Sequence, residues 1–354
     1  MWRPLRTRSA SPAVKVASCS TNHTCSEGSR LTGTRKKVLV IVGPTASGKS
    51  AAAEAVDELI HAELISADSM QVYAGMDVAT DKPGAESRRR HRYHLLDVAA
   101  PGEPFTVVRY RELAREAIDR VVSAGRLPVL VGGSGLYVRA VVDDLEFPAP
   151  RGPLEGARAR ERLEALGGDE LYARLKRVDP EAASRIHPHN KRRLLRVLEF
   201  IEETGQPFSA LQERWARRRS IYDLRMYGLR RSREELHAAI DRRVDGMLEH
   251  GLVDEARKMR SLGLETAAQA LGYKELEPYL AGREDLDEAV SRLKRATRRF
   301  AKRQLTWFER DERVRWIDAG GKGPLDVARI IVGQLREEGW LEERLVKKEN
   351  GRCE

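Results

Sequence analysis

The strongest constraint on this chain is a glycine-rich loop at residues 43–50, which reads Gly-Pro-Thr-Ala-Ser-Gly-Lys-Ser. An apolar run at residues 38–42 precedes the loop and predicts a buried strand, and the helical pattern of residues 50–62 follows it. Two glycines with four residues between them, followed by Lys and Ser, are typical of a loop that binds phosphate groups. A loop of this kind between a strand and a helix predicts a P-loop-like α/β core.

The loop has a clear physical chemistry. Its glycines let several backbone N–H groups converge on phosphate oxygens, and the N-terminus of the following helix adds positive potential. Lys49 would supply a point charge, and Ser50 would be a ligand for Mg²⁺. The residues predicted to bind a phosphate chain are Gly43, Pro44, Thr45, Ala46, Ser47, Gly48, Lys49 and Ser50. Nucleotide hydrolysis, phosphoryl transfer and the use of a diphosphate leaving group all remain open at this point.

Strands alternate with helices in the first part of the chain and helices dominate the middle, which implies a parallel sheet covered by helices, with a helical insertion. Further strands are predicted at residues 62–66, 127–131 and 221–229, and long helices at 109–123, 233–262, 286–309 and 324–339. The predicted division is a disordered N-terminal extension at 1–36, a P-loop-like core at 37–145 plus 221–320, a helical insertion at 146–220, and a C-terminal helix and charged tail at 321–354.

Composition limits the partners. The net charge of +10, from 64 Lys and Arg against 54 Asp and Glu, favours a polyanionic partner. The three cysteines, Cys19, Cys25 and Cys353, lack metal-ligand spacing, so neither a disulfide framework nor a zinc site is predicted. No apolar run approaches the roughly 20 residues of a membrane helix, so no membrane partner is expected.

Two more features follow predicted strands. Asp68 comes after the strand at 62–66, and a second glycine turn, Gly-Gly-Ser-Gly at residues 132–135, comes after the strand at 127–131. Both should lie beside the phosphate loop, because the carboxyl ends of parallel strands share one edge of a sheet. A carboxylate there could bind Mg²⁺, act as a general base or cap the following turn. The second turn could offer N–H groups to a substrate, or need glycine for its tight geometry.

Taken together, these motifs closely resemble the tRNA dimethylallyltransferase family. The matches include the phosphate loop, Ile-Ser-Ala-Asp-Ser-Met-Gln-Val-Tyr at 65–73, the second glycine turn, Gln-Ala-Leu-Gly-Tyr-Lys-Glu at 269–275 and Ala-Lys-Arg-Gln-Leu-Thr-Trp-Phe at 301–308. They keep the family's order over residues 38–318, which is more specific than any single motif.

The resemblance implies transfer of a dimethylallyl group from dimethylallyl diphosphate to N6 of the adenosine 3′ of the anticodon, in tRNAs reading codons that begin with U. The products would be N6-(dimethylallyl)adenosine and diphosphate, with Mg²⁺ present, so the phosphate loop would hold a leaving group. The partner would be the tRNA anticodon stem-loop, which the helical insertion at 146–220 would contact, while the core at 37–145 plus 221–320 would be catalytic. A monomer is expected. The absence of a C-terminal Cys/His finger, which eukaryotic relatives often carry, predicts a bacterial cytoplasmic enzyme.

The resemblance also assigns roles to residues. Asp68 matches the general base, and Thr45 matches a threonine that hydrogen-bonds the bridging oxygen of the donor. Arg243 matches an arginine that contacts the diphosphate, with a shift to Arg242 left open. Ser134 replaces the more usual threonine. The predicted tRNA contacts are Asp68, Ser69, Met70, Gln71, Ser134, Arg192, Arg193, Leu194, Leu195, Arg196, Lys274, Arg298, Arg299, Lys302 and Arg303.

A basic segment supports RNA as the acceptor. Residues 291–303 carry seven basic side chains and no acidic one. As a helix they would align Arg292, Arg295, Arg299 and Lys302 in a stripe able to follow phosphates. Three rival classes remain: a small-metabolite kinase, which would consume ATP; a non-catalytic RNA-binding P-loop protein, which would form no product; and an adenylate prenyltransferase, which would act on free AMP or ADP.

Overall fold

Six parallel strands form one sheet in the computed structural model, which describes residues 35–147, 153–263 and 270–347. Most of the predicted N-terminal extension and the end of the charged tail lie outside the described residues, as do the three cysteines. The α/β prediction is confirmed. In spatial order the strands are β3 (Tyr93–His94), β2 (Ala62–Ser66), β4 (Leu127–Gly132), β1 (Lys37–Val42), β5 (Asp223–Arg230) and β6 (Val314–Asp318).

The strand register brings the loops of interest to one edge. Val42 at the end of β1 lies opposite Gly132 on β4 and Gly228 on β5, and Ser66 at the end of β2 lies opposite Val131. The strands are apolar because both faces of the sheet are covered, as residues 38–42 of β1 show by being fully buried. The segments that leave β1, β2 and β4 therefore emerge side by side.

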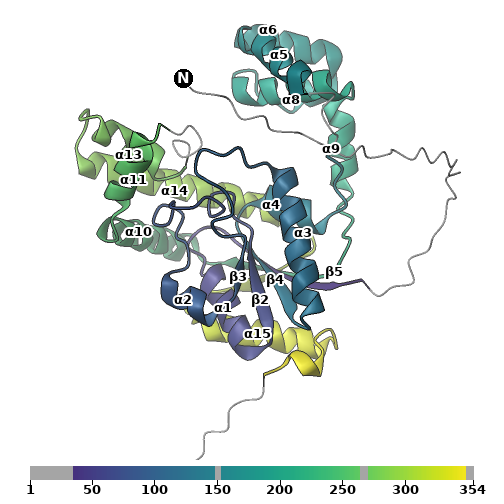
Figure 1. Ribbon diagram of the computed structural model, residues 1–354, viewed down its shortest axis with the longest axis vertical. Helices are drawn as coiled ribbons and strands as arrows, with labels where there is room; N and C mark the ends of the chain where they lie inside the picture. The colour runs from purple at the N-terminus through teal and green to yellow at the C-terminus, as the bar shows by residue number, and fades with distance from the viewer. Residues whose placement is uncertain (1–34, 148–152, 264–269, 348–354) are drawn as a thin grey trace, which may run out of the picture. The chain divides into compact units, whose positions relative to one another are not determined.

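Helices cover the two faces with separate apolar cores. On one face, α1 (Lys49–Leu59) packs against α15 (Pro324–Glu337), and the two lie together in Figure 1. On the other face lie α3 (Val107–Ser123), α4 (Gly135–Val142) and α14 (Leu286–Glu309). The helix predicted at 324–339 thus completes the cover of the sheet beside the phosphate loop's own helix.

The helices between α4 and β5 bury a core of their own. Leu163, Leu171 and Leu194 are among its fully buried side chains. Asp179 joins two of these helices, because its carboxylate accepts hydrogen bonds from the N–H groups of Ala182 at 3.0 Å and Ser209 at 2.8 Å. The helices are α5 (Pro153–Glu164), α6 (Gly168–Val178), α7 (Pro180–Ser184), α8 (Lys191–Thr204) and α9 (Phe208–Ala216).

One predicted helix is wrong in its length. The segment 233–262 forms two helices, α10 (Arg233–Glu249) and α11 (Leu252–Ser261), because Gly251 between them has a φ of +86°. A left-handed glycine ends a helix that its flanking pattern would continue. The chain continues through α13 (Tyr273–Leu280) into α14, and α2 (Ala85–Arg90) precedes β3. Among the described helices, none has the length and apolar character to cross a membrane.

Candidate active site

The first glycine turn, residues 43–50, takes the backbone shape that phosphate binding requires. Gly48 has a φ of +92°, and Ala46 is also left-handed at +63°. The Lys49 Nζ atom donates a hydrogen bond to the Pro44 carbonyl oxygen at 3.2 Å. The pKa of Lys49 is lowered to about 8, first by burial and second by the charge of Arg243, while Asp68 and Asp81 oppose the shift. The turn therefore presents a cation that an incoming anion would stabilise.

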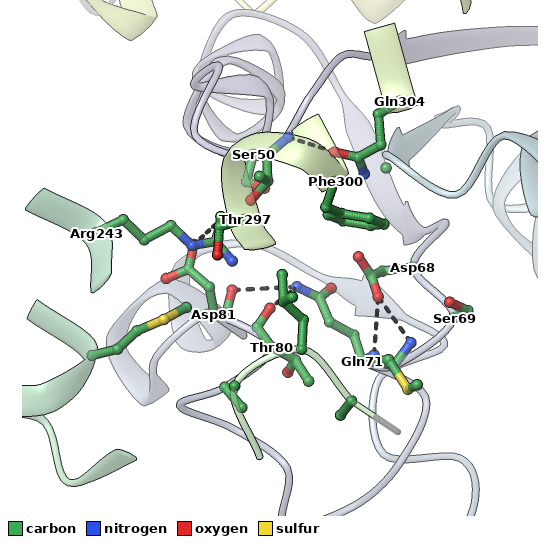
Figure 2. Close-up of a pocket in the computed structure, with 18 of the residues that line it drawn as sticks. Ser50, Asp68, Ser69, Gln71, Thr80, Asp81, Arg243, Thr297, Phe300 and Gln304 are labelled. Atoms are coloured by element: carbon green, nitrogen blue, oxygen red, sulfur yellow. Dashed lines mark hydrogen bonds and ion pairs between the residues drawn. The ribbon is translucent and has the colours of Figure 1, made fainter. Parts of the chain in front are cut away.

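A cavity of about 350 Å³ lies beside this turn. Thr45, Lys49 and Ser50 from the turn line it, together with residues that follow β2 and residues of α10 and α14. Figure 2 shows labelled side chains from these segments, Ser50, Asp68, Arg243 and Phe300 among them, around a common space. Its apolar lining comes from Val244, Met247, Ala270, Leu271, Leu293 and Phe300.

Asp68 uses its two carboxylate oxygens differently. Oδ1 accepts hydrogen bonds from the N–H groups of Met70 at 2.8 Å and Gln71 at 3.4 Å, so the capping role is realised. Among the described residues none bonds to Oδ2, and Figure 2 shows this oxygen directed toward Phe300. Capping therefore leaves one oxygen available to a substrate in the cavity.

Gln71 is engaged within the protein. Its Oε1 atom accepts a hydrogen bond from the Ser66 hydroxyl at 2.8 Å, and its Nε2 atom donates to the carbonyl oxygens of Thr80 at 3.1 Å and Asp81 at 3.2 Å. These bonds hold the segment that carries Asp81 against the cavity. Pairing of Gln71 with an adenine edge would require it to exchange them.

Arg243 faces the cavity, and Arg242 does not. Arg243 Nη1 lies 3.2 Å from Asp81 Oδ2, and both residues line the cavity. Arg242 is exposed and is absent from the lining. Of the two adjacent arginines, Arg243 is therefore the one that lines the cavity.

The second glycine turn, residues 132–135, needs glycine for contact and not for its dihedral angles, since none of its glycines has a positive φ. A Cβ on Gly132 would lie 2.1 Å from the Ala67 carbonyl oxygen. A Cβ on Gly133 would lie 2.1 Å from Gln304 Nε2, and one on Gly135 would lie 2.1 Å from the Trp307 ring. The turn is thus a docking place for the neighbouring segment and for α14.

Ser134 ties the same turn to the segment of Asp68. Its hydroxyl oxygen accepts a hydrogen bond from the Ser69 N–H at 3.1 Å and lies 3.4 Å from the Ser69 hydroxyl. A serine suffices for this contact, because only the hydroxyl takes part.

Gln304 is a site residue that sequence reasoning missed. Its Oε1 atom accepts a hydrogen bond from the Thr45 N–H at 2.8 Å, and its Nε2 atom donates to the Gly133 carbonyl oxygen at 3.1 Å. The buried side chain therefore connects the two glycine turns. The sequence does hold one indication of this role, because Gln304 is a polar residue on the apolar face of an amphipathic helix. Ala301 and Phe308, which are buried on the same face, lie three residues before it and four after it.

The basic segment of α14 divides into two parts. Ion pairs hold three of its cations: Arg292 with Glu284, Lys294 with Asp245 at 2.6 Å, and Arg298 with Asp241 at 2.5 Å. A second group of cations is exposed, and within the described residues no carboxylate forms an ion pair with them. This group is Arg295, Arg299, Lys302 and Arg303. Arg303 also lines the cavity, with its guanidinium 5.7 Å from the centre of the Phe300 ring.

The remaining predicted tRNA contacts differ in exposure. Arg192, Arg193 and Arg196 are exposed on α8, whereas Leu195 is half-buried. Leu194 is fully buried in the core of the insertion, so its side chain cannot contact RNA directly. Lys274 is exposed and lines the cavity.

Comparisons with known proteins agree on one family. A profile of the IPP transferase family matches residues 71–311. The chain is 43% identical to a tRNA dimethylallyltransferase of Geobacillus kaustophilus (strain HTA426), over 86% of this chain and 98% of that protein. It is 46% identical to a tRNA dimethylallyltransferase of Streptomyces coelicolor, over 84% of this chain and 95% of that protein.

Solved structures give the same result. A tRNA isopentenylpyrophosphate transferase from Bacillus halodurans superposes with a TM-score of 0.63 at 39% identity, covering 86% of this chain and 98% of its own. A eukaryotic dimethylallyltransferase described as acting on tRNA superposes with a TM-score of 0.74 at 25% identity, covering 89% of this chain and 81% of its own.

Proposed function

The chain belongs to the IPP transferase family, and we propose that it transfers a dimethylallyl group from dimethylallyl diphosphate to N6 of the adenosine 3′ of the anticodon in tRNA. The single observation that carries the proposal is the shared cavity. A phosphate-binding turn, a carboxylate with an available oxygen and an apolar lining meet in one space of about 350 Å³. An ATP-dependent kinase would need the turn but not this apolar lining.

The donor's diphosphate would lie on the first glycine turn. The backbone of the turn, Lys49 and Arg243 would face its charge, and Thr45 would hydrogen-bond its bridging oxygen. These groups stabilise negative charge that grows on the diphosphate as the carbon–oxygen bond breaks. The prenyl tail would contact Met247, Leu271 and their apolar neighbours.

Asp68 would act as the general base. The N6 lone pair attacks the carbon bonded to the donor oxygen, and the electrons of the breaking carbon–oxygen bond leave with the diphosphate. The N6 atom then carries an extra proton, which Asp68 Oδ2 would accept. The hydrogen bonds of Met70 and Gln71 to Oδ1 would hold the carboxylate in place during the transfer.

Magnesium fits the residues at the first glycine turn. Ser50 lines the same cavity as Asp68 and Asp81, and Mg²⁺ takes oxygen ligands of this kind together with phosphate oxygens and water. In residues 35–147, 153–263 and 270–347, no three His, Cys, Asp or Glu residues gather as a metal site, which suits an ion held largely by the donor's phosphates. Bound Mg²⁺ would neutralise charge on the diphosphate.

One assay tests the proposal against its rivals. The protein is incubated with unmodified tRNA, AMP, ATP and dimethylallyl diphosphate, singly and in pairs, and nucleosides are analysed by mass. Prenylated adenosine is expected only with tRNA plus dimethylallyl diphosphate. Consumption of ATP would indicate a kinase, and prenylated AMP would indicate an adenylate prenyltransferase. If no product formed, a non-catalytic RNA-binding protein would be the remaining class.

The role of Asp68 has its own test. Asp68→Asn keeps an oxygen that can accept the Met70 N–H, but it removes the base, so turnover should fall by about 10²- to 10⁴-fold with donor binding retained. Asp254→Asn, on the exposed surface of α11, is the matched control and should be neutral. Near-normal turnover of Asp68→Asn would exclude the base role.

A further inference from the structure

Trp307 is exposed in a way that its environment does not explain. Among the described residues, five large apolar side chains are exposed, and Trp307 is the one aromatic side chain of that group, with 44% of its surface accessible. An indole of this size would normally be buried, because its burial is strongly favourable. Leu136, next to the contact between Trp307 and Gly135, is also exposed, at 36%.

The position of Trp307 follows from the helix that carries it. Arg303 and Gln304 line the cavity, and Trp307 lies four and three residues further along α14, on the same face. The Cδ1, Nε1 and Cε2 atoms of its ring occupy the space that a Cβ on Gly135 would need. This contact fixes one part of the indole at the end of the second glycine turn, about one helical turn along α14 from the cavity-lining Arg303 and Gln304, and leaves the rest in solvent.

The charge around Trp307 is positive. Lys302 and Arg303 lie five and four residues before it on α14, Arg310 lies three residues after it at the helix C-cap, and all three are exposed. In the sequence from 302 to 310, exposed Glu309 is the one acidic residue. Among the described residues, no carboxylate forms an ion pair with any of them. Aromatic surface surrounded by unpaired cations is the chemistry that binds single-stranded nucleic acid, since bases stack on the ring while phosphates meet the charges.

We propose that Trp307 is a stacking platform for the nucleotide base that adjoins the target adenine in the anticodon loop. This inference rests on the proposed function. Moving the adenine into the cavity removes it from the stack of the loop, so a neighbouring base loses one stacking partner. The exposed indole at the rim offers a replacement surface, which stabilises the opened loop without reading its sequence.

The test measures coupling between the indole and the base. Wild type, Trp307→Ala and Trp307→Phe are assayed on an anticodon stem-loop RNA, and on two further RNAs with an abasic site 5′ or 3′ of the target adenosine. With intact RNA, Trp307→Ala should raise KM for RNA roughly 5- to 100-fold, and Trp307→Phe should raise it much less. KM for dimethylallyl diphosphate should be unchanged in both variants.

The abasic RNAs decide the interpretation. On the RNA that lacks the stacked base, wild type should bind weakly and Trp307→Ala should cause little further loss. An equal loss on intact RNA and on both abasic RNAs would overturn the proposal, because it would show that Trp307 only supports the glycine turn. Leu325→Ala, at an exposed apolar side chain of α15, is the control and should not change KM. Product formation by wild type on intact RNA tests the proposed function separately.

Discussion

The two glycine turns at the carboxyl edge of the sheet look alike in sequence but use glycine for different reasons. In the first turn, Gly48 has a left-handed φ of +92°, and the nearest atom to a Cβ placed on it would be 3.5 Å away. In the second turn, Gly132 has no positive φ, yet a Cβ there would lie 2.1 Å from the Ala67 carbonyl oxygen. At Gly48 the first turn needs a backbone shape, whereas Gly132 of the second turn needs space. Gly43 of the first turn combines both needs, with a φ of +154° and a Cβ position 2.8 Å from the Leu229 carbonyl oxygen.

This difference separates ligand binding from assembly of the site. The first turn directs Lys49 and Ser50 to the cavity, so changes there should affect substrate more than folding. The second turn receives Gln304 and Trp307 of α14 and the segment before Asp68, so changes there should affect folding first. Substitutions in the two turns can therefore be compared directly.

The largest effect is expected from Lys49→Met in the first turn. Removing the cation that faces the diphosphate should lower turnover by about 10²- to 10³-fold, the loss that follows removal of one group that stabilises a developing anion. Stability should not fall, because burial disfavours the charged lysine in the folded protein. Single-turnover rates and chemical unfolding measure the two quantities, with exposed Lys322→Met as the control. Parallel losses of rate and stability would contradict the separation.

The next effect is expected from Gly132→Ala in the second turn. A methyl group 2.1 Å from a backbone oxygen forces the two strand ends apart, so the free energy of unfolding should fall by about 1–3 kcal/mol. Gly84→Ala is the matched control, because nothing lies within 4 Å of its Cβ position and its φ is −67°. Urea unfolding compares the two variants, and equal midpoints would show that the second turn has room to relax.

Gln304→Leu should weaken the connection between the turns. The substitution removes the hydrogen bonds to the Thr45 N–H and the Gly133 carbonyl oxygen while keeping most of the volume. A loss of about 1–3 kcal/mol in the free energy of unfolding is expected, because a buried N–H group and a buried carbonyl oxygen are left without a partner. The variant should also bind diphosphate less tightly, because Thr45 is no longer held. Unchanged diphosphate binding would show that the first turn is rigid on its own.

The sequence predicted one turn better than the other for a physical reason. Phosphate binding imposes a local backbone shape, so the residues of the first turn, Lys49 and Ser50 included, form a motif that can be recognised in the sequence. The second turn's partners are distant in sequence, and Gln304 is 171 residues from Gly133. Contacts between residues so far apart in the sequence produce no local residue spacing from which they could be predicted.

The same limit applies elsewhere in the chain. Strands β1, β2, β4 and β5 were predicted from the sequence, whereas the two-residue β3 and the more polar β6 were not. The basic segment 291–303 was predicted as one surface, but Glu284, Asp245 and Asp241 from outside α14 neutralise part of it. Of the cations they bind, only Arg292 belongs to the predicted stripe. No pattern within residues 291–303 could reveal carboxylates that other segments supply. Sequence resemblance favoured Arg243 with a shift to Arg242 left open, and only the orientation of α10 shows which of the two lines the cavity.

The smallest effect is a pH dependence confined to the first turn. The pKa of Lys49 is lowered to about 8, so its charge is lost in the folded protein before the unfolded chain loses it near 10.5. Between these values the unfolded state binds more protons, so stability should rise with pH, while the affinity for inorganic diphosphate should fall by roughly tenfold between pH 7 and 9.

The control is Lys49→Arg, which stays charged over this pH range and experiences the same ionisation of the ligand. Titration calorimetry on the wild type and on Lys49→Arg separates the contribution of the lysine proton from the ionisation of the ligand. Identical pH profiles of diphosphate affinity would show that Lys49 keeps its proton when the turn is empty. Gly132→Ala should leave this profile unchanged, because the second turn holds no titrating group.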